Sequence, residues 1–368
     1  MSLFKRSITA EICSHGGVVF STLIVVWLSV LLVRLLGEAV QGTIGTDIVL
    51  GIAALSTITA LPTILTVALF IAVLVTISRN YRESEMVVWF SSGQSILNWL
   101  TPISIVAIPT TVVIAFLSIQ GSPWAYSQIE EYRQRFEQRS DFSKVAQGQF
   151  LETGGGSRVI FIESSDNKEY PMGRVFATAV EKGWETIITA KYARFRTNND
   201  NEKFVDLGPG NRYDNEIGTA RFRIAKFDNY TLRIESHKDV SDDKIHELIQ
   251  SKLKARQFGK LLSDDNPKSD AQIMWRLSLP LAALNLALLA IPLGAVNPRL
   301  GRSLNLVIAG LIALFYMNLI NLVRGWIAND QLNFMVGTIT LNALASILCV
   351  YLFWRALHVK KPRAPRAT

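Results

Sequence analysis

The sequence predicts an α-helical membrane protein with six transmembrane helices, three on each side of an inserted all-β domain that is jelly-roll-like. Two observations of composition lead to this class. The 368-residue chain is 49% hydrophobic, and its apolar residues gather toward the two ends. The middle, roughly 121–275, has the composition of a soluble domain, with 24 Lys and Arg against 24 Asp and Glu. The whole net charge of +8 therefore falls on the end segments, where it flanks apolar runs.

The six predicted membrane helices follow from the lengths of the apolar runs. A helix needs about 20 mainly apolar residues to cross a bilayer. The first run is too long for a cleavable signal peptide, and no small-x-small cleavage site follows it. The six qualifying segments are Gly16–Leu36, Ile48–Ile77, Leu100–Ile119, Leu277–Val296, Leu304–Val323 and Phe334–Trp354.

The distribution of Lys and Arg predicts the orientation. Eleven basic residues lie at the N-terminus, after spans two and four, and in the C-terminal tail, whereas the opposite short loops carry only Arg34 and Arg324. Cytoplasmic loops are enriched in Lys and Arg, so we expect cytoplasmic termini and an external middle domain. The expected divisions are 1–121 for spans one to three, 122–272 for the β-domain with flanking helices, 273–358 for spans four to six, and 359–368 for a basic cytoplasmic tail.

Alternating apolar and polar residues predict the strands of the middle domain. These runs are rich in β-branched and aromatic residues, and the turn sequences "NNDN" at 198–201 and "GPGN" at 208–211 separate them. A helix is expected to lead back to the membrane at 242–262. Short strands with such turns are typical of a sandwich, a jelly roll or an open barrel. The predicted strands cover 158–164, 174–180, 184–196, 203–207 and 220–234.

One face of these strands carries Phe161, Ile187 and Phe222. The ordinary interpretation is the core of a sandwich. The alternative is a groove that accepts acyl chains. Periodicity does not separate the two interpretations, because a lipid groove and a core need the same residues.

Several catalytic motifs are absent from the sequence. There is no G-x-x-x-x-G-K-[ST] phosphate loop, G-x-S-x-G elbow or H-E-x-x-H motif. "GGGS" at 154–157 lacks the lysine and is expected to be a hairpin loop. Four His and two Cys residues show no metal-ligand spacing. None of the six spans holds an Asp or Glu well inside it, which disfavours an ion-coupled carrier. We therefore expect no catalytic residue, metal or cofactor on this chain, and energy supplied from outside.

The connection between spans two and three is elaborate for a simple loop. It reads "SRNYRESEMVVWFSSGQSILNW" at 78–99. Taken as a helix over 82–92, it places Met86, Trp89 and Phe90 on one face.

Acidic residues open this predicted helix, and a glycine closes it. Glu83 and Glu85 lie in its first turn, and Gly93 is placed to end it. One interpretation is a helix lying on the bilayer surface. Against it, surface anchors carry Lys and Arg on the polar face, whereas this helix carries carboxylates. The other interpretation is an aromatic knob with an acidic rim that inserts into the basic groove of a motor ATPase.

Six short motifs occur in order along nearly the whole chain. Together, on this three-plus-three frame, they resemble the permease subunits of the bacterial lipopolysaccharide export ABC transporter, the F-type more than its G-type partner. The motifs are "LVRLLGEAV" at 32–40, "ESEMVVWFSSG" at 83–93, "AQGQF" at 146–150, "FIES" at 161–164, "WR" at 275–276 and "VNPRLGR" at 296–302.

The resemblance implies a place for this chain in a larger machine of the bacterial inner membrane. A G-type permease would pair with it, and a homodimeric cytoplasmic ATPase would hold ATP and Mg beneath them. The connection at 78–99 would form the coupling helix, at about 80–95, with Glu85 contacting a basic ATPase residue. The middle domain would be a periplasmic jelly roll that hands lipopolysaccharide to a bitopic subunit, the first part of a bridge of jelly rolls toward the outer membrane.

Three arginines at span ends are candidates for binding lipopolysaccharide, because a guanidinium binds phosphate through a bidentate fork. They are Arg34, Arg276 and Arg324. The alternative for each is simple snorkelling to the interface. Relatives often carry a second basic residue one turn before Arg34, where this chain has Leu31.

Two rival functions stay open at this point. One is a permease of another ABC class, for lipoprotein release or efflux, which also inserts a large periplasmic domain but usually shows four spans. The other is a membrane scaffold without transport activity, which would recruit no ATPase and bind no lipopolysaccharide.

Overall fold

The computed structural model describes residues 3–357 except 42, 94, 138–149, 154–157, 165–171, 182, 198–202, 235–247, 250 and 296–303. The expected loop at 154–157, the turn at 198–201 and the basic tail at 359–368 lie outside these residues. The chain divides into two compact units. A helical unit comprises 1–30, 54–129 and 249–368, and a β unit comprises 31–53 and 130–248.

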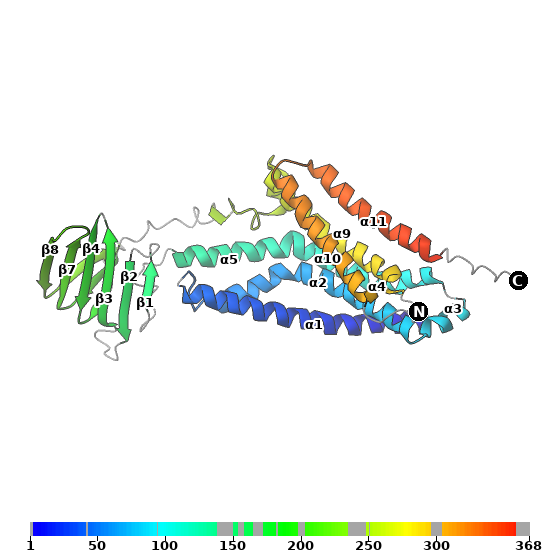
Figure 1. Cartoon of the computed structure of the whole chain (residues 1–368), viewed down its shortest axis with the longest axis horizontal. Helices are drawn as coiled ribbons and strands as arrows, with labels where there is room; N and C mark the ends of the chain where they lie inside the picture. Colours follow the sequence, from blue (N-terminus) through cyan, green and yellow to red (C-terminus); the bar gives the residue numbers. More distant parts are fainter. Residues whose placement is uncertain are drawn as a thin grey trace, which may run out of the picture. The chain divides into compact units, whose positions relative to one another are not determined.

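Six helices are long and apolar enough to cross a membrane, which confirms the predicted three-plus-three arrangement around a β insert. Several extend beyond their apolar runs, because polar residues continue the helix past the hydrocarbon-length segment. The third span runs on through a π turn at Leu117–Gly121 into α5, Ser122–Glu137. The third span begins with α4 (Leu100–Phe116), and the other five are α1 (Leu3–Val40), α2 (Val49–Arg82), α9 (Pro267–Gly294), α10 (Leu304–Ala328) and α11 (Phe334–Leu357) (Figure 1).

Helix α9 is the centre of the helical unit. It packs against α4, α10 and α11, and 61% of its most apolar 18-residue segment is buried. In α1, only 6% of the corresponding segment is buried. An apolar helix that is so little covered by its own chain needs lipid or another protein against it.

The end of α9 makes a close contact with α2. A Cβ atom added at Gly294 would lie 2.9 Å from Cγ2 of Ile77 and 3.4 Å from the carbonyl oxygen of Leu74. The Ser78 hydroxyl donates a hydrogen bond to the Gly294 carbonyl at 3.5 Å. Glycine is therefore required at this position for the two backbones to approach.

The β unit holds one antiparallel sheet of nine strands among the described residues, which confirms the inserted all-β region. Its order is β8-β7-β4-β3-β5-β6-β9, with β1 and β2 added at the other edge of β3. The strands are β1 (Phe150–Thr153), β2 (Arg158–Ser164), β3 (Met172–Glu181), β4 (Trp184–Ala190), β5 (Ala193–Thr197), β6 (Lys203–Leu207), β7 (Gly210–Glu216), β8 (Phe222–Phe227) and β9 (Tyr230–Ile234).

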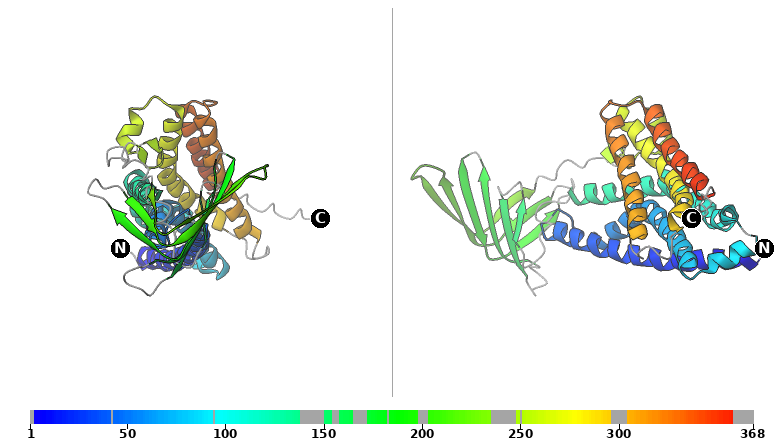
Figure 2. Two further views of the ribbon diagram at one scale, coloured as in Figure 1. Left: turned by 90° about the vertical axis from the view of Figure 1, so that its left-hand side faces the viewer. Right: turned by 45° about the vertical axis from the view of Figure 1, so that its right-hand side comes forward.

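A break after β4 divides this sheet into two wings. Strand β3 pairs with β4 over most of its length, but with β5 only at Met172. The chain therefore leaves β4, passes Lys191 and Tyr192, and begins a second wing, β5-β6-β9, that turns away from β4-β7-β8 (Figure 2). The buried cluster draws on both wings and on β2 and β3, with Ile162, Val175, Ile188, Ala190, Ala193, Val205 and Leu207.

The strand predictions are right in position and wrong in continuity. The runs 184–196 and 220–234 are each two strands, because the chain changes wing at Lys191 and turns at Asp228. Strand β7 was not predicted, because its sequence "GNRYDNE" is polar and follows a turn motif.

The helix predicted over 242–262 is interrupted in its described part. Leu248, Ile249 and Ser251 are helical, residues 252–257 form bends and turns, and the short helix α8 then covers Phe258–Leu262. The turns leave backbone carbonyls free of helical partners.

Candidate functional site

The connection between α2 and α4 contains a break that the sequence pattern does not reveal. Helix α2 ends at Arg82, and Ser84 adopts a left-handed conformation with φ +60°. Helix α3 begins only at Glu85 and ends at Ser91. The predicted helix over 82–92 is therefore wrong at its start, and Glu83 lies in the connection. Gly93, with φ +83°, follows the last turn, where a left-handed residue ends a helix.

The apolar face of α3 packs into the protein itself. Met86 is 3% exposed, and the ring of Trp89 meets that of Phe4 edge to face at 4.8 Å. Phe4 in turn packs on Trp99 at 5.4 Å. The expected outward knob of Met86, Trp89 and Phe90 is thus wrong for its first two residues, because α3 folds back onto the start of α1.

A different set of side chains on α3 faces outward. Val87, Val88 and Phe90 are all exposed, and the Glu85 side chain is 41% exposed. This outward surface of α3, defined by these four residues, pairs an apolar patch with a carboxylate. Helical spacing does carry the signal for it, since Val87 and Val88 lie opposite the buried Met86 and Trp89.

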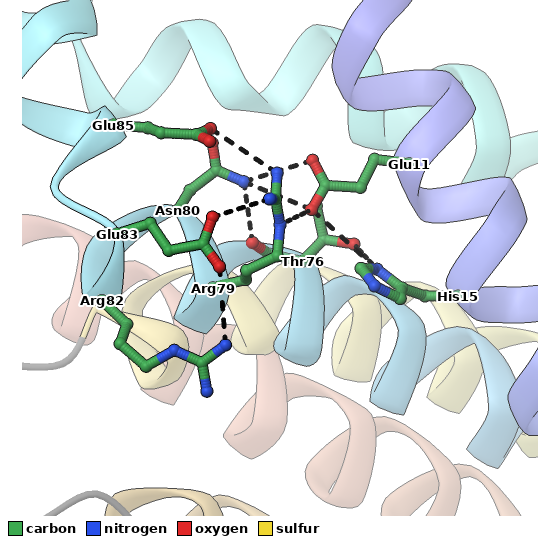
Figure 3. A network of polar contacts seen from close by, with 8 residues as sticks. All are labelled: Glu11, His15, Thr76, Arg79, Asn80, Arg82, Glu83 and Glu85. Atoms are coloured by element: carbon green, nitrogen blue, oxygen red, sulfur yellow. Dashed lines mark hydrogen bonds and ion pairs between the residues drawn. The ribbon is translucent and has the colours of Figure 1, made fainter.

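The acidic residues of this region surround one arginine. Glu83 and Glu85 both contact Arg79 of α2, at 2.8 Å and 3.6 Å, and Glu11 of α1 contacts it from the other side (Figure 3). The predicted acidic rim is therefore present, but it is already partnered within the chain.

Two of the three predicted lipid-binding arginines meet in one pocket of the helical unit. Its volume is about 310 Å³. Arg276 of α9 and Arg324 of α10 line it together, and Lys254 reaches it from the turns before α8. Other lining residues include Trp27, Pro62, Tyr126, Gln272 and Trp275.

Arg276 is almost fully buried, at 2% exposure. Its Nη2 donates to the carbonyl oxygens of Lys254 and Arg256, at 3.2 and 2.9 Å, and lies 3.5 Å from that of Leu253. These carbonyls belong to the turns that replace the predicted helix. The Nη1 atom is buried and has no hydrogen-bond partner among the described residues. A buried guanidinium with an unused donor is costly unless something completes its bonding.

The other two cations of the pocket are also held by uncharged groups. Arg324 donates from Nη2 to Oε1 of Gln272 at 2.8 Å and stacks 5.2 Å from the ring of Trp275. Lys254 places its ammonium 5.6 Å from the ring of Tyr126. None of the described residues that line the pocket is an Asp or Glu. The pocket therefore keeps its positive potential, which suits an anion.

Lys254 is the residue that sequence reasoning missed in this pocket. It belongs to the segment predicted as a helix that leads back to the membrane, and its place depends on the turns at 252–257.

Arg34 is not among the residues of this pocket. It belongs to the β unit, its side chain is 74% exposed, and its Nε donates to Oε1 of Glu38 at 3.1 Å. Glu38 also accepts from Nη2 of Arg133 at 2.8 Å.

The predicted sheet residues share one face. The register joins Phe161 to Phe176, Ile187 to Tyr213, and Phe222 to Asn215. This face is opposite the buried cluster that contains Val175 and Ile188, so its interpretation as the sandwich core is wrong. Phe222 is 57% exposed and stacks on Tyr213 at 6.3 Å.

An open cleft of about 850 Å³ crosses this same face. Phe161 and Phe176 contribute its apolar lining, and Arg174, Lys191 and Lys226 contribute cations. Within the cleft, Arg174 pairs with Glu163 at 2.9 Å. That pairing lowers the pKa of Glu163, through its hydrogen bond and the charge of the guanidinium.

Comparisons with known proteins agree on one family. A family model described as "Lipopolysaccharide export system permease LptF/LptG" matches residues 6–355. The chain is 28% identical over 337 residues to the lipopolysaccharide export system permease protein LptF of Escherichia coli strain K12. The same values hold for the LptF proteins of Escherichia coli O157:H7 and Shigella flexneri, with 90% of each chain covered.

Proposed function

Because this chain belongs to the LptF/LptG family of lipopolysaccharide export permeases, we propose that it is the F-type subunit of an ABC transporter that extracts lipopolysaccharide from the inner membrane. ATP hydrolysis on partner subunits would drive the step. The F-type assignment is supported by the LptF relatives, which match over 90% of this chain. The chain itself is a multi-pass inner-membrane protein of the permease class.

The proposed assembly places this chain beside a G-type permease and above a homodimeric ATPase that binds ATP and Mg. Both termini face the cytoplasm and the β unit lies in the periplasm, as the eleven basic residues on one side of the membrane favour. A bitopic jelly-roll subunit receives the lipid from the β unit. The thinly covered helix α1 is a suitable surface for the partner permease.

The pocket around Arg276 carries the proposal. Lipopolysaccharide presents phosphate groups next to several acyl chains. A guanidinium binds phosphate through two parallel hydrogen bonds, and Nη1 of Arg276 still has its donors unused among the described residues. Snorkelling does not account for a side chain that is 2% exposed. Arg324 and Lys254 would supply further positive charge to the same headgroup.

The outward surface of α3 is the proposed contact with the ATPase. Val87, Val88 and Phe90 would fill an apolar groove, and Glu85 would meet a basic residue at its edge. Closure of the ATPase dimer would then displace α3 and narrow the cavity between the two permeases.

The open sheet face is the proposed route for the acyl chains. Burying each CH₂ group is worth about 0.8 kcal/mol, so a lipid with several acyl chains needs an apolar cover when it leaves the bilayer. Phe161, Ile187 and Phe222 lie on the face that is open to supply it.

Photocrosslinking tests the proposed substrate directly. A photoreactive residue is placed at Trp27 or Tyr126 in the pocket, or at exposed Val112 on α4 as a control. The complex with its permease and ATPase partners is reconstituted with lipopolysaccharide. We expect adducts from the two pocket positions that decline when ATP is added, and none from position 112. Adducts at 112 alone would contradict the pocket, and lipoprotein adducts would favour the lipoprotein-release class.

A further inference from the structure

A polar network joins α1, α2 and α3 at one end of the helical unit, and Arg79 is at its centre (Figure 3). Its Nε donates to Oε1 of Glu11 at 2.5 Å. Its Nη1 donates to Oε2 of Glu83 at 2.8 Å, and its Nη2 lies 3.6 Å from Oε2 of Glu85. One guanidinium therefore contacts three carboxylates, which come from α1, from the connection and from α3.

The contact with Glu11 is the most firmly held of the three. The Glu11 side chain is only 15% exposed, and its Oε2 also accepts from Nδ2 of Asn80 at 3.3 Å. Asn80 is fully buried, and its Nδ2 also donates to the Thr76 carbonyl at 2.9 Å. The Nδ1 of His15 lies 2.9 Å from the Thr76 hydroxyl and 4.0 Å from Glu11. Glu11 thus holds Arg79 by its Nε and leaves both terminal nitrogens directed toward the connection.

The contact with Glu85 is the weakest of the three. At 3.6 Å it is longer than a charge-assisted hydrogen bond, which measures about 2.7–2.9 Å. The Glu85 side chain is 41% exposed, so water and salt screen the pair. It is also the acid at the edge of the outward surface of α3. A basic group that approaches this surface would compete with Arg79 for the same carboxylate.

We propose that Arg79 is a positioning residue that holds Glu85 in the free permease and gives it up when a basic group of the ATPase docks. This inference rests on the proposed function, which makes Glu85 the docking acid. Glu11 keeps Arg79 attached to α1 while the outer partner is exchanged. Docking then breaks the ion pair between α3 and α2, while the ion pair between α1 and α2 is kept.

If Glu85 exchanges Arg79 for a basic group of the ATPase, variants at Arg79 and Glu11 change ATPase affinity in opposite directions, which misfolding would not do. Removing Arg79 removes a competitor for Glu85, so the ATPase should bind more tightly. Removing Glu11 frees Arg79 to turn fully toward Glu85, so the ATPase should bind less tightly. A residue needed only for folding would weaken binding in both cases.

The test measures the affinity of the ATPase for the permease pair in nanodiscs. The R79Q variant is compared with R82Q, which removes the same charge from the neighbouring turn. Arg82 is 60% exposed and lies 3.7 Å from Glu83. We expect R79Q to lower Kd by about two- to fivefold, the range for one exposed ion pair, and R82Q to change it less. We expect E11Q to raise Kd by about twofold.

The double variant R79Q/E85Q shows whether Arg79 acts through Glu85. We expect it to bind no more tightly than E85Q alone, because without the Glu85 carboxylate Arg79 and the ATPase have no group to compete for. Three results would contradict the proposed exchange of partners at Glu85: R79Q and R82Q change Kd equally, E11Q leaves Kd unchanged, or R79Q/E85Q binds the ATPase more tightly than E85Q. If instead E85Q alone binds as well as the unmodified chain, the docking role of Glu85 in the proposed function is wrong.

Discussion

Arg79 and Arg276 occupy opposite environments in the same helical unit. Arg79 contacts three carboxylates, so its charge is neutralised within the chain. Arg276 is bound by backbone carbonyls, and its pocket has no acidic residue in the part of the chain that the structure describes. Carbonyl dipoles fix the direction of a guanidinium without cancelling its charge. The comparison therefore separates an arginine that joins helices from one whose charge stays available for a ligand.

The largest effect is expected from removing the pocket's buried arginine. Arg276→Met leaves the carbonyls of Lys254 and Arg256 without this donor, and an unsatisfied buried group costs about 1–3 kcal/mol. We expect a clear fall in the thermal midpoint in detergent, together with loss of lipopolysaccharide binding. Arg324→Met is the matched control, because it removes the same charge but leaves those carbonyls paired. An unchanged midpoint for Arg276→Met would contradict a structural role for these bonds.

The next largest effect is expected from adding a carboxylate to the pocket, so that Arg324 is paired with an acid as Arg79 is. Gln272→Glu places a carboxylate where Gln272 now accepts from Arg324. We expect the affinity for lipopolysaccharide to fall at least about tenfold, since 1.4 kcal/mol is one decade, while the thermal midpoint holds or rises. Gln272→Met removes the acceptor without adding charge. It therefore distinguishes the effect of neutralising Arg324 from the effect of losing its hydrogen bond to residue 272. Equal affinities for the Glu variant and the unmodified protein would show that the pocket's charge is not used.

A third arginine, Arg212, extends the comparison to the β unit. It bonds Asp214 at 2.9 Å and the Tyr230 hydroxyl at 2.8 Å, on the face of the buried cluster. Burial opposes a low pKa for Asp214, but hydrogen bonds from Thr186 and Arg212 outweigh it, and the pKa lies below its usual range. Asp214 therefore contributes stability above its unfolded pKa of about 3.9, and this stability is lost as pH falls through the folded pKa.

We expect Asp214→Asn to destabilise the β unit by about 1–2 kcal/mol at neutral pH. The difference should shrink as acid protonates Asp214 in the unmodified chain. Hydrogen exchange of peptides from β4 and β7, corrected for the intrinsic pH dependence, measures it. A difference that stays constant down to about pH 3 would contradict the lowered pKa.

The smallest effect is expected at Arg34. Its ion pair with Glu38 is exposed, and such pairs contribute about 0.2–1 kcal/mol. Arg34→Gln should leave the thermal midpoint almost unchanged. Any fall in lipopolysaccharide transport by this variant would then reflect a contact with the ligand, and normal transport would remove Arg34 from the proposed binding residues.

The parts of the fold set by composition and periodicity were predictable. Run length identified six spans, and alternation located most strands. The orientation of short elements was not predictable, because Met86 and Trp89 satisfy helical spacing whether they face a partner or the protein's own Phe4. Lys254 was missed for a related reason, since its position depends on turns whose carbonyls bind Arg276, a contact between distant segments.

The close approach at Gly294 has a mechanical consequence. It fixes the end of α9 to the last turns of α2. A helix that precedes the β insert therefore moves together with one that follows it. A displacement of α3 by the proposed ATPase contact would therefore be transmitted to spans on both sides of the insert. A bulkier side chain at position 294 would push the end of α9 away from α2 and weaken this coupling.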